Sequence, residues 1–313
     1  MNSLIRSLHH VTATVTDAQA DLDFYTGLLG QRLVKKTVNF DNHHVYHFYY
    51  GNEAGTPGTI MTTFPYKGKG VRVGRKGAGQ ITATSFSVPA AALGFWRKRF
   101  AERKLPFEDE PPRFGEDAIR VLDPSGLVLR LVGSARDPRA PWVRTDIGAD
   151  RAIRGIHGVT LLVRDPAKTI ALLTEMLDGT VVDEIAGTTR VGIGGALPGQ
   201  IVEVARAAAE GDAVNGLGTV HHVAFAVGDA EQQLQMRDEL LRRGLQVTEV
   251  LDRQYFSSIY FREPNGVLFE IATLPPGFTA DEELRDLGSA LKLPPWEEPQ
   301  RASIEAGLPA VTH

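Results

Sequence analysis

The sequence predicts an α+β protein made of four tandem βαβββ modules, which form two domains with curved half-barrel sheets. Two observations predict this fold. A histidine-containing opening strand recurs along the chain, and an acid-Pro-x-Gly turn precedes an apolar strand twice. Self-similarity of this kind indicates that each copy is one supersecondary unit. The expected modules cover residues 8–66, 80–133, 156–206 and 220–273.

The opening strand is the clearest repeat. Its copies read Leu8-His9-His10-Val11-Thr12, Ile156-His157-Gly158-Val159-Thr160 and Val220-His221-His222-Val223-Ala224, with a weaker copy at Gln80-Ile81-Thr82-Ala83-Thr84. In the three clear copies an aspartate stands at the same spacing and precedes a segment with helical periodicity. Helices are therefore expected at Ala18–Leu29, Pro89–Arg103, Pro166–Leu177 and Ala230–Arg243.

A second repeated element closes two of the modules. Asp123-Pro124-Ser125-Gly126 and Glu263-Pro264-Asn265-Gly266 each precede a run of apolar residues. Such a tetrad is typical of a hairpin turn that enters a strand.

The domain boundaries follow from the stretches without periodicity. Residues 133–151 contain Pro and Arg and separate two pairs of modules. The sequence thus predicts an N-terminal pair within 1–140, a C-terminal pair within 150–274, and a tail at 275–313 packed on the core. A short helical stretch is expected near Ala280–Leu291.

Composition excludes several classes of protein. The 313 residues hold 34 Lys+Arg and 38 Asp+Glu, a formal net charge of −4, which does not favour a nucleic acid partner. With no cysteine, thiolate metal sites and cysteine nucleophiles are excluded, so a metal would need nitrogen and oxygen ligands. No apolar stretch approaches the roughly 18 residues of a membrane span. We expect a cytoplasmic protein that does not associate with membranes.

Strand alternation selects His10, His222 and Glu270 as metal-ligand candidates. His222 shares a strand face with Ala224, while Val223 lies on the opposite face, which suits the core. Glu270 likewise points away from its apolar neighbours. Two histidines and one carboxylate without a thiolate form the ligand set of non-haem Fe(II) sites that activate dioxygen. Zinc or manganese could take the same three ligands.

The other modules lack this set, because Gly158 and Arg130 stand at the equivalent positions. His10 belongs to the first module, whereas His222 and Glu270 belong to the fourth. Ligands of one ion lie within a few ångströms of it, so modules one and four are expected to pair, as are modules two and three. His43 and His47 lie roughly 13 Å apart on a predicted strand and are interpreted as solvent-face or pocket-rim residues.

These modules resemble the vicinal oxygen chelate superfamily, which includes glyoxalase I and the extradiol dioxygenases, over residues 8–274. Within it, the opening strand, the His221-His222 pair, Asp252-Arg253-Gln254-Tyr255-Phe256 and the span from Tyr260 to Glu270 are similar to hydroquinone 1,2-dioxygenases. The resemblance implies ring cleavage of a hydroquinone by dioxygen at Fe(II), with catechols less suited and Mn(II) an alternative metal. A homo-oligomer is compatible with it.

The resemblance also implies roles for individual residues. The metal ligands fall on His10, His222 and Glu270. The surrounding site residues fall on five positions: His9, Thr12, His221, Arg253 and Tyr260. Arg253 would stabilise developing negative charge, Tyr260 would hydrogen-bond the substrate oxygen, Thr12 would contact substrate, and His9 or His221 would orient a hydroxyl or transfer a proton. Strict alternation turns His9 and His221 to the opposite face, so both roles require an irregularity in the strand.

Two other functions are compatible with the sequence. One is a metal-dependent isomerase or lyase of the glyoxalase type, although such sites usually require a fourth protein ligand, against which Arg130 and Gly158 argue. The other is a non-catalytic resistance protein that binds an aromatic molecule. Metal content of freshly purified protein separates the two.

Overall fold

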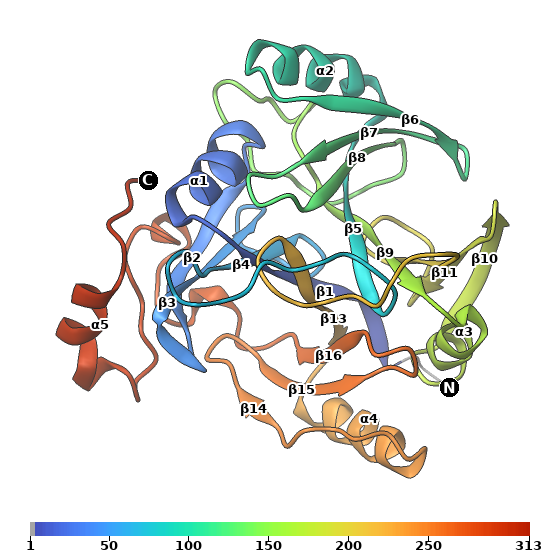
Figure 1. Cartoon of the computed structure of the whole chain (residues 1–313). Helices are drawn as coiled ribbons and strands as arrows, with labels where there is room; N and C mark the ends of the chain where they lie inside the picture. The colour runs from blue at the N-terminus through green and yellow to red at the C-terminus, as the bar shows by residue number, and fades with distance from the viewer. Residues whose placement is uncertain (1–3) are drawn as a thin grey trace.

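The computed structural model describes residues 4–313 and contains two eight-stranded sheets (Figure 1). The strands of the first sheet are β1 (Ile5–Val15), β2 (Arg32–Asn39), β3 (Asn42–Gly51), β4 (Ile60–Pro65), β13 (Thr219–Val227), β14 (Leu251–Asp252), β15 (Ser257–Arg262) and β16 (Leu268–Thr273). Those of the second are β5 (Gln80–Pro89), β6 (Phe107–Arg113), β7 (Glu116–Leu122), β8 (Val128–Ser134), β9 (Gly155–Val163), β10 (Gly179–Ile185), β11 (Thr188–Ile193) and β12 (Ile201–Arg206).

Each sheet joins one module from the N-terminal half of the chain to one module from the C-terminal half. The first has the order β14-β15-β16-β13-β1-β4-β3-β2, and the second the order β10-β11-β12-β9-β5-β8-β7-β6. The antiparallel pair of β1 and β13 lies in the middle of the first sheet, and that of β5 and β9 lies in the middle of the second. Modules one and four therefore share one sheet and modules two and three the other, which confirms the expected pairing. The division into 1–140, 150–274 and 275–313 stays a prediction.

Four helical segments follow the opening strands, close to where they are expected. They are α1 (Ala18–Leu22) with a π-helical continuation (Asp23–Leu28), a 3-10 turn (Ala90–Ala92) with α2 (Leu93–Glu102), α3 (Pro166–Glu175) and α4 (Ala230–Arg242). The repeated aspartates explain two of the helix starts. Asp17 accepts hydrogen bonds from the backbone N–H groups of Gln19 and Ala20, and Asp229 accepts one from that of Gln232.

The two acid-Pro-x-Gly turns use the same hydrogen bonds. Asp123 Oδ1 accepts from the backbone N–H groups of Ser125 and Leu127, and Glu263 Oε1 accepts from those of Asn265 and Val267. Gly126 and Gly266 have φ of 86° and 92°, a conformation that strongly favours glycine. A single turn chemistry therefore leads into β8 and β16.

The C-terminal segment differs from the expectation of one helix near Ala280–Leu291. That region has 3-10 turns at Phe278–Ala280 and Leu284–Asp286, and a further turn (Glu298–Gln300) leads into α5 (Arg301–Gly307). Lys35 on β2 explains the irregular course. Its fully buried ammonium group pairs with both Asp281 and Glu282, which fixes this stretch against the sheet.

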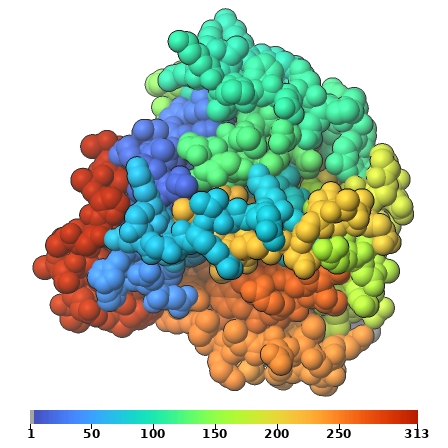
Figure 2. Space-filling view, in the orientation of Figure 1, coloured from blue at the N-terminus to red at the C-terminus, as the bar shows by residue number. Residues whose placement is uncertain are grey.

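The loops that connect modules one to two and three to four run together across one face of the molecule (Figures 1 and 2). Val73 bridges to Leu217 and Arg75 to Val214. The basic Lys67–Lys76 stretch is thus part of the connection between modules one and two. Within residues 4–313 no helix is long and apolar enough to cross a membrane.

Candidate metal centre

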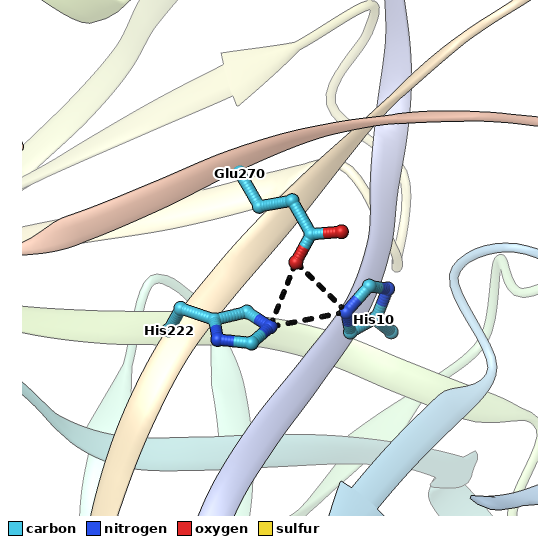
Figure 3. Close-up of side chains that lie close together, drawn as sticks. All are labelled: His10, His222 and Glu270. Carbon is cyan, nitrogen blue, oxygen red and sulfur yellow. Dashed lines mark hydrogen bonds and ion pairs between the residues drawn. The ribbon is translucent and has the colours of Figure 1, made fainter. Parts of the chain in front are cut away.

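Three buried side chains converge from three neighbouring strands of the first sheet (Figure 3). His10 lies on β1, His222 on β13 and Glu270 on β16. The two Nε2 atoms are 3.2 Å apart, and Glu270 Oε2 lies 3.3 Å from His10 Nε2 and 2.8 Å from His222 Nε2. Residues separated by up to 260 positions therefore place one ligand atom each at a common point.

Strand register produces this convergence. Glu270 pairs with Ala224 on the adjacent parallel strand, two residues beyond His222. On the other face, Val223 and Phe225 are fully buried in the hydrophobic core. The side that carries the ligands has alanine beside them, which leaves space for an ion and a substrate.

Two β-bulges place consecutive histidines around the site. Leu8 pairs with Phe225 and His10 with Ala224, so His9 is an extra residue in its strand. His221 is the equivalent extra residue on β13, where Thr12 pairs with His222 and Ala13 with Val220. These are the irregularities that the roles of His9 and His221 require.

Each ligand histidine contacts the histidine that precedes it. Nδ1 of His9 lies 2.8 Å from Nδ1 of His10, and the same distance separates the Nδ1 atoms of His221 and His222. Burial lowers the pKa of His9 and of His221 to about 3, so both are neutral at pH 7. A hydrogen bond between His9 and the Thr273 backbone carbonyl uses its other nitrogen. In the tautomer in which His10 Nδ1–H donates to His9 Nδ1, His10 Nε2 carries a lone pair that a metal ion could accept.

Glu270 is held by Ser258, whose hydroxyl donates to Oε1. Burial alone would raise the pKa of Glu270, but interactions with His10 and His222 outweigh it and hold that pKa well below its ordinary value. Ser258 escaped the sequence prediction. It lies two residues before Tyr260, the residue that pairs with Glu270, so the hairpin register would have revealed it.

The residues fit a divalent cation. The two Nε2 atoms and Glu270 Oε2 are buried and lie within 3.3 Å of one another. Neutral imidazole nitrogens and a carboxylate oxygen are ligands that a divalent cation accepts, so one ion could bind all three. Ligands about 2.1 Å from one ion, at right angles, would be about 3 Å apart, close to the distances here.

A cavity of about 330 Å³ adjoins His10 and His222. This volume lies at the small end of the range for ligand pockets, about 300–1,000 Å³. Its walls are largely aromatic, and its polar groups lie near the ligands. The aromatic residues are Phe40, Tyr49, Phe64, Tyr66 and Phe256, and the polar ones include Thr12, His47, His221, Arg253 and Tyr260.

Arg253 and Tyr260 form one polar group in this cavity. Arg253 Nε lies 3.3 Å from the Tyr260 hydroxyl, and the Tyr260 ring contacts His222 edge to face. Burial and the charge of Glu270 raise the pKa of Tyr260, which therefore stays a hydrogen-bond donor at neutral pH. Asp41, which the sequence did not single out, pairs with the Arg253 guanidinium at 3.2 Å.

His47 lines the cavity, which agrees with the pocket-rim alternative and not with a solvent-face position. Its Nε2 lies 2.9 Å from Thr62 Oγ1, which donates to Thr12 Oγ1 at 2.8 Å. Burial and the charges of His10 and His222 lower the pKa of His47 well below its ordinary value. His43 has a different partner, Glu297, outside this cavity.

Thr62 occupies the position that a fourth protein ligand would take. Thr62 pairs with Thr12, two residues beyond His10, just as Glu270 pairs with Ala224, two residues beyond His222. Thr62 is therefore the counterpart of Glu270 in the repeat. Because module one pairs with module four, a fourth protein ligand would have to come from position 62. Gly158 and Arg130 belong to the other sheet and do not bear on this question. The hydroxyl of Thr62 is already engaged by Thr12 and His47.

The second sheet holds ion pairs at the equivalent place. Glu203 lies 2.8 Å from Arg190 and 3.9 Å from Arg130, and Glu116 pairs with Arg190 and His157. The arginine side chains supply positive charge there, so this sheet needs no ion to balance its carboxylates.

Sheets of paired modules with a two-histidine, one-carboxylate cluster facing an aromatic cavity define the class of metal-dependent vicinal oxygen chelate proteins. Comparison of sequences assigns the family. Residues 7–131 and 155–271 match the Glyoxalase/Bleomycin resistance protein/Dioxygenase superfamily, and the chain belongs to it.

Curated relatives match this chain over nearly the full length of both proteins. A Bacillus subtilis (strain 168) protein named "Putative ring-cleaving dioxygenase MhqE" is 45% identical over 302 residues, 96% of this chain and 98% of the relative. The "Chlorohydroquinone/hydroquinone 1,2-dioxygenase" of Sphingobium indicum is 34% identical over 302 residues, 94% of this chain and 93% of its own.

Solved structures agree with this fold. A crystal structure named "putative dioxygenase" from Bacillus subtilis has a TM-score of 0.94 at 41% identity, over 99% of this chain and 98% of the other. Glyoxalase I from Zea mays has a TM-score of 0.64 at 14% identity, over 86% and 92%, and shares the fold alone.

Proposed function

We propose that the protein is a ring-cleaving dioxygenase that acts on a hydroquinone or substituted hydroquinone and uses Fe(II) held by His10, His222 and Glu270. The observation that carries this proposal is the convergence of three ligand atoms beside an aromatic cavity, with Thr62 in place of a fourth ligand. The names of the full-length relatives support the substrate class. Mn(II) is compatible with the same ligands.

Fe(II) supplies Lewis-acid activation of the diol and electron transfer to dioxygen when it is bound. The aromatic walls hold the ring, and Tyr260 donates a hydrogen bond to a substrate oxygen. Neutral His47 accepts a proton from a substrate hydroxyl, with its ring fixed by Thr62. Arg253 stabilises negative charge as the ring opens. Both atoms of dioxygen enter an open-chain unsaturated product.

The bulge histidines act through the ligands in this proposal. His9 uses both ring nitrogens, on His10 and on the Thr273 backbone, so it positions His10 and does not contact the diol. His221 contacts His222 in the same way and also borders the cavity. Thr12 orients Thr62 and contacts the substrate.

Oxygen uptake after anaerobic loading with Fe(II) tests the proposal. Para-diols are expected to give uptake, and ortho-diols less. Glu270→Gln should abolish both iron binding and uptake, whereas Glu203→Gln, in the second sheet, should leave iron content unchanged. Absence of uptake by the loaded enzyme with every diol would overturn the dioxygenase assignment. Iron-free purified protein that nonetheless binds aromatic compounds would favour a binding protein instead.

A further inference from the structure

A second cavity, of about 170 Å³, lies beside the metal cluster and is separate from the aromatic cavity. The loop between β3 and β4, the residues before β15 and the start of the C-terminal segment enclose it. Thr56 and Thr279 are exposed at its mouth, while His9 and Phe256 are buried at its inner end.

One layer of side chains separates this cavity from the proposed ligands. Phe256 borders both cavities. Its ring centroid lies 5.2 Å from that of His10 and 5.0 Å from that of His9. The rings of Phe256 and His10 are therefore in direct contact, with no backbone strand between them.

The surface of the cavity is mainly apolar. Ile60, Leu274, Phe256 and Phe278 line it, and its buried polar groups have partners elsewhere. The Tyr255 hydroxyl donates to Asp281. The nitrogens of His9 are likewise engaged, as described above. A charged or strongly polar molecule would find few hydrogen-bond partners, so the cavity suits a small apolar one.

The geometry points to this second cavity as the route by which dioxygen reaches the metal cluster, an inference that rests on the proposed function. A bound diol fills the aromatic cavity and closes that approach. Dioxygen is small and apolar, and the second cavity leads to His10 from the opposite side of Phe256. The two substrates would then enter by different paths, which allows dioxygen to arrive after the diol.

Ala54 offers a position for testing this route. It is half-buried on the cavity wall and contacts neither the ligands nor the aromatic cavity. Gly55 beside it is unsuitable, because it has φ of 64° and an added Cβ would lie 2.8 Å from the Phe278 ring. Ala171 is a matched control, because it is half-buried like Ala54 but lies on helix α3, which packs against the second sheet.

The experiment measures kcat/KM for dioxygen and for hydroquinone separately, with Fe(II)-loaded wild type, Ala54→Trp and Ala171→Trp. A large ring at position 54 should lower kcat/KM for dioxygen about fivefold or more and leave kcat/KM for hydroquinone at saturating dioxygen unchanged. Ala171→Trp should change neither.

Xenon binding gives a readout that does not depend on activity. Crystals of the protein under xenon pressure should show the gas beside Phe256 in the wild type and lose it in Ala54→Trp. Unchanged kcat/KM for dioxygen in Ala54→Trp, with the xenon site lost, would overturn the route alone. A wild type that binds xenon there but consumes no dioxygen with any diol would overturn the proposed function and the route together.

Discussion

Nδ1 of His9 lies 2.8 Å from Nδ1 of His10, and a bulge in β1 makes this contact between adjacent residues. The same arrangement recurs at His221 and His222 across the pseudo-symmetric strand pair. Each of the two proposed histidine ligands thus has an imidazole partner that orients its ring. Partners of this kind typically contribute 10- to 100-fold in metal affinity.

Replacement of His9 or His221 by alanine should therefore weaken Fe(II) binding about 10- to 100-fold, by chelator competition. The matched control is His157→Ala, because His157 occupies the equivalent bulge in the second sheet. That variant should bind iron as the wild type does. Equal affinity in all three variants would contradict the positioning role.

Arg253→Met should lower kcat about 100-fold while the iron content stays constant, because Arg253 supplies charge to the reacting substrate and no ligand to the metal. Asp41→Asn should have an effect of less than about tenfold, since Asp41 is 72% exposed on its side chain and water screens its ion pair. Steady-state kinetics with metal analysis separates these effects. Loss of iron in Arg253→Met would contradict the assignment.

His47→Asn should lower kcat by about 10² to 10⁴, the range for loss of a proton-transfer group. His43→Asn is its control, since His43 lies on the same strand but pairs with Glu297. If the two variants had the same kcat as the wild type, His47 would have no part in proton transfer.

Asp21 should make the protein less stable as the pH rises. Burial raises its pKa from 3.8 to about 7, although the Thr63 and Tyr50 hydroxyls donate to it. Between about pH 4 and 7 the folded protein holds a proton that the unfolded chain has lost. The free energy of unfolding should therefore fall by up to about 1.4 kcal/mol per pH unit from this group.

Urea unfolding at pH 5, 6 and 7 measures that slope, and Asp21→Asn should reduce it. Asp17→Asn provides the contrast. In the wild type, hydrogen bonds from Lys67 and from the helix N-terminus lower the pKa of Asp17. The stability that this carboxylate contributes is therefore lost only at more acidic pH. An Asp21→Asn variant with the wild-type slope would show that this carboxyl is ionised in the folded protein.

The sequence alone predicted the modules and the three converging side chains, because repeats and two-residue alternation are visible in the order of the residues. The pairing of modules one and four followed from the distribution of those side chains between the two modules. The turn residues Asp123 and Glu263 and the helix-capping Asp17 and Asp229 act within a few positions of themselves. Their structural effects could therefore be predicted without tertiary contacts.

Other residues needed the folded chain. Asp41 meets Arg253 across 212 positions. His47 enters the cavity because its hairpin places it beside Thr62, and spacing along one strand does not reveal that contact. The C-terminal segment follows Lys35 and its two carboxylates, so local periodicity did not predict its course.

The placement of β1 beside β13, which in turn pairs with β16, also sets the order in which the molecule matures. During synthesis His10 emerges more than 200 residues before His222 and Glu270, so the ribosome-bound chain has no complete ligand set until the last module is made. The proposed Fe(II) would be bound only by a chain that includes β16. A nascent or truncated chain that ends before β16 would be spared oxidative damage from its own cofactor.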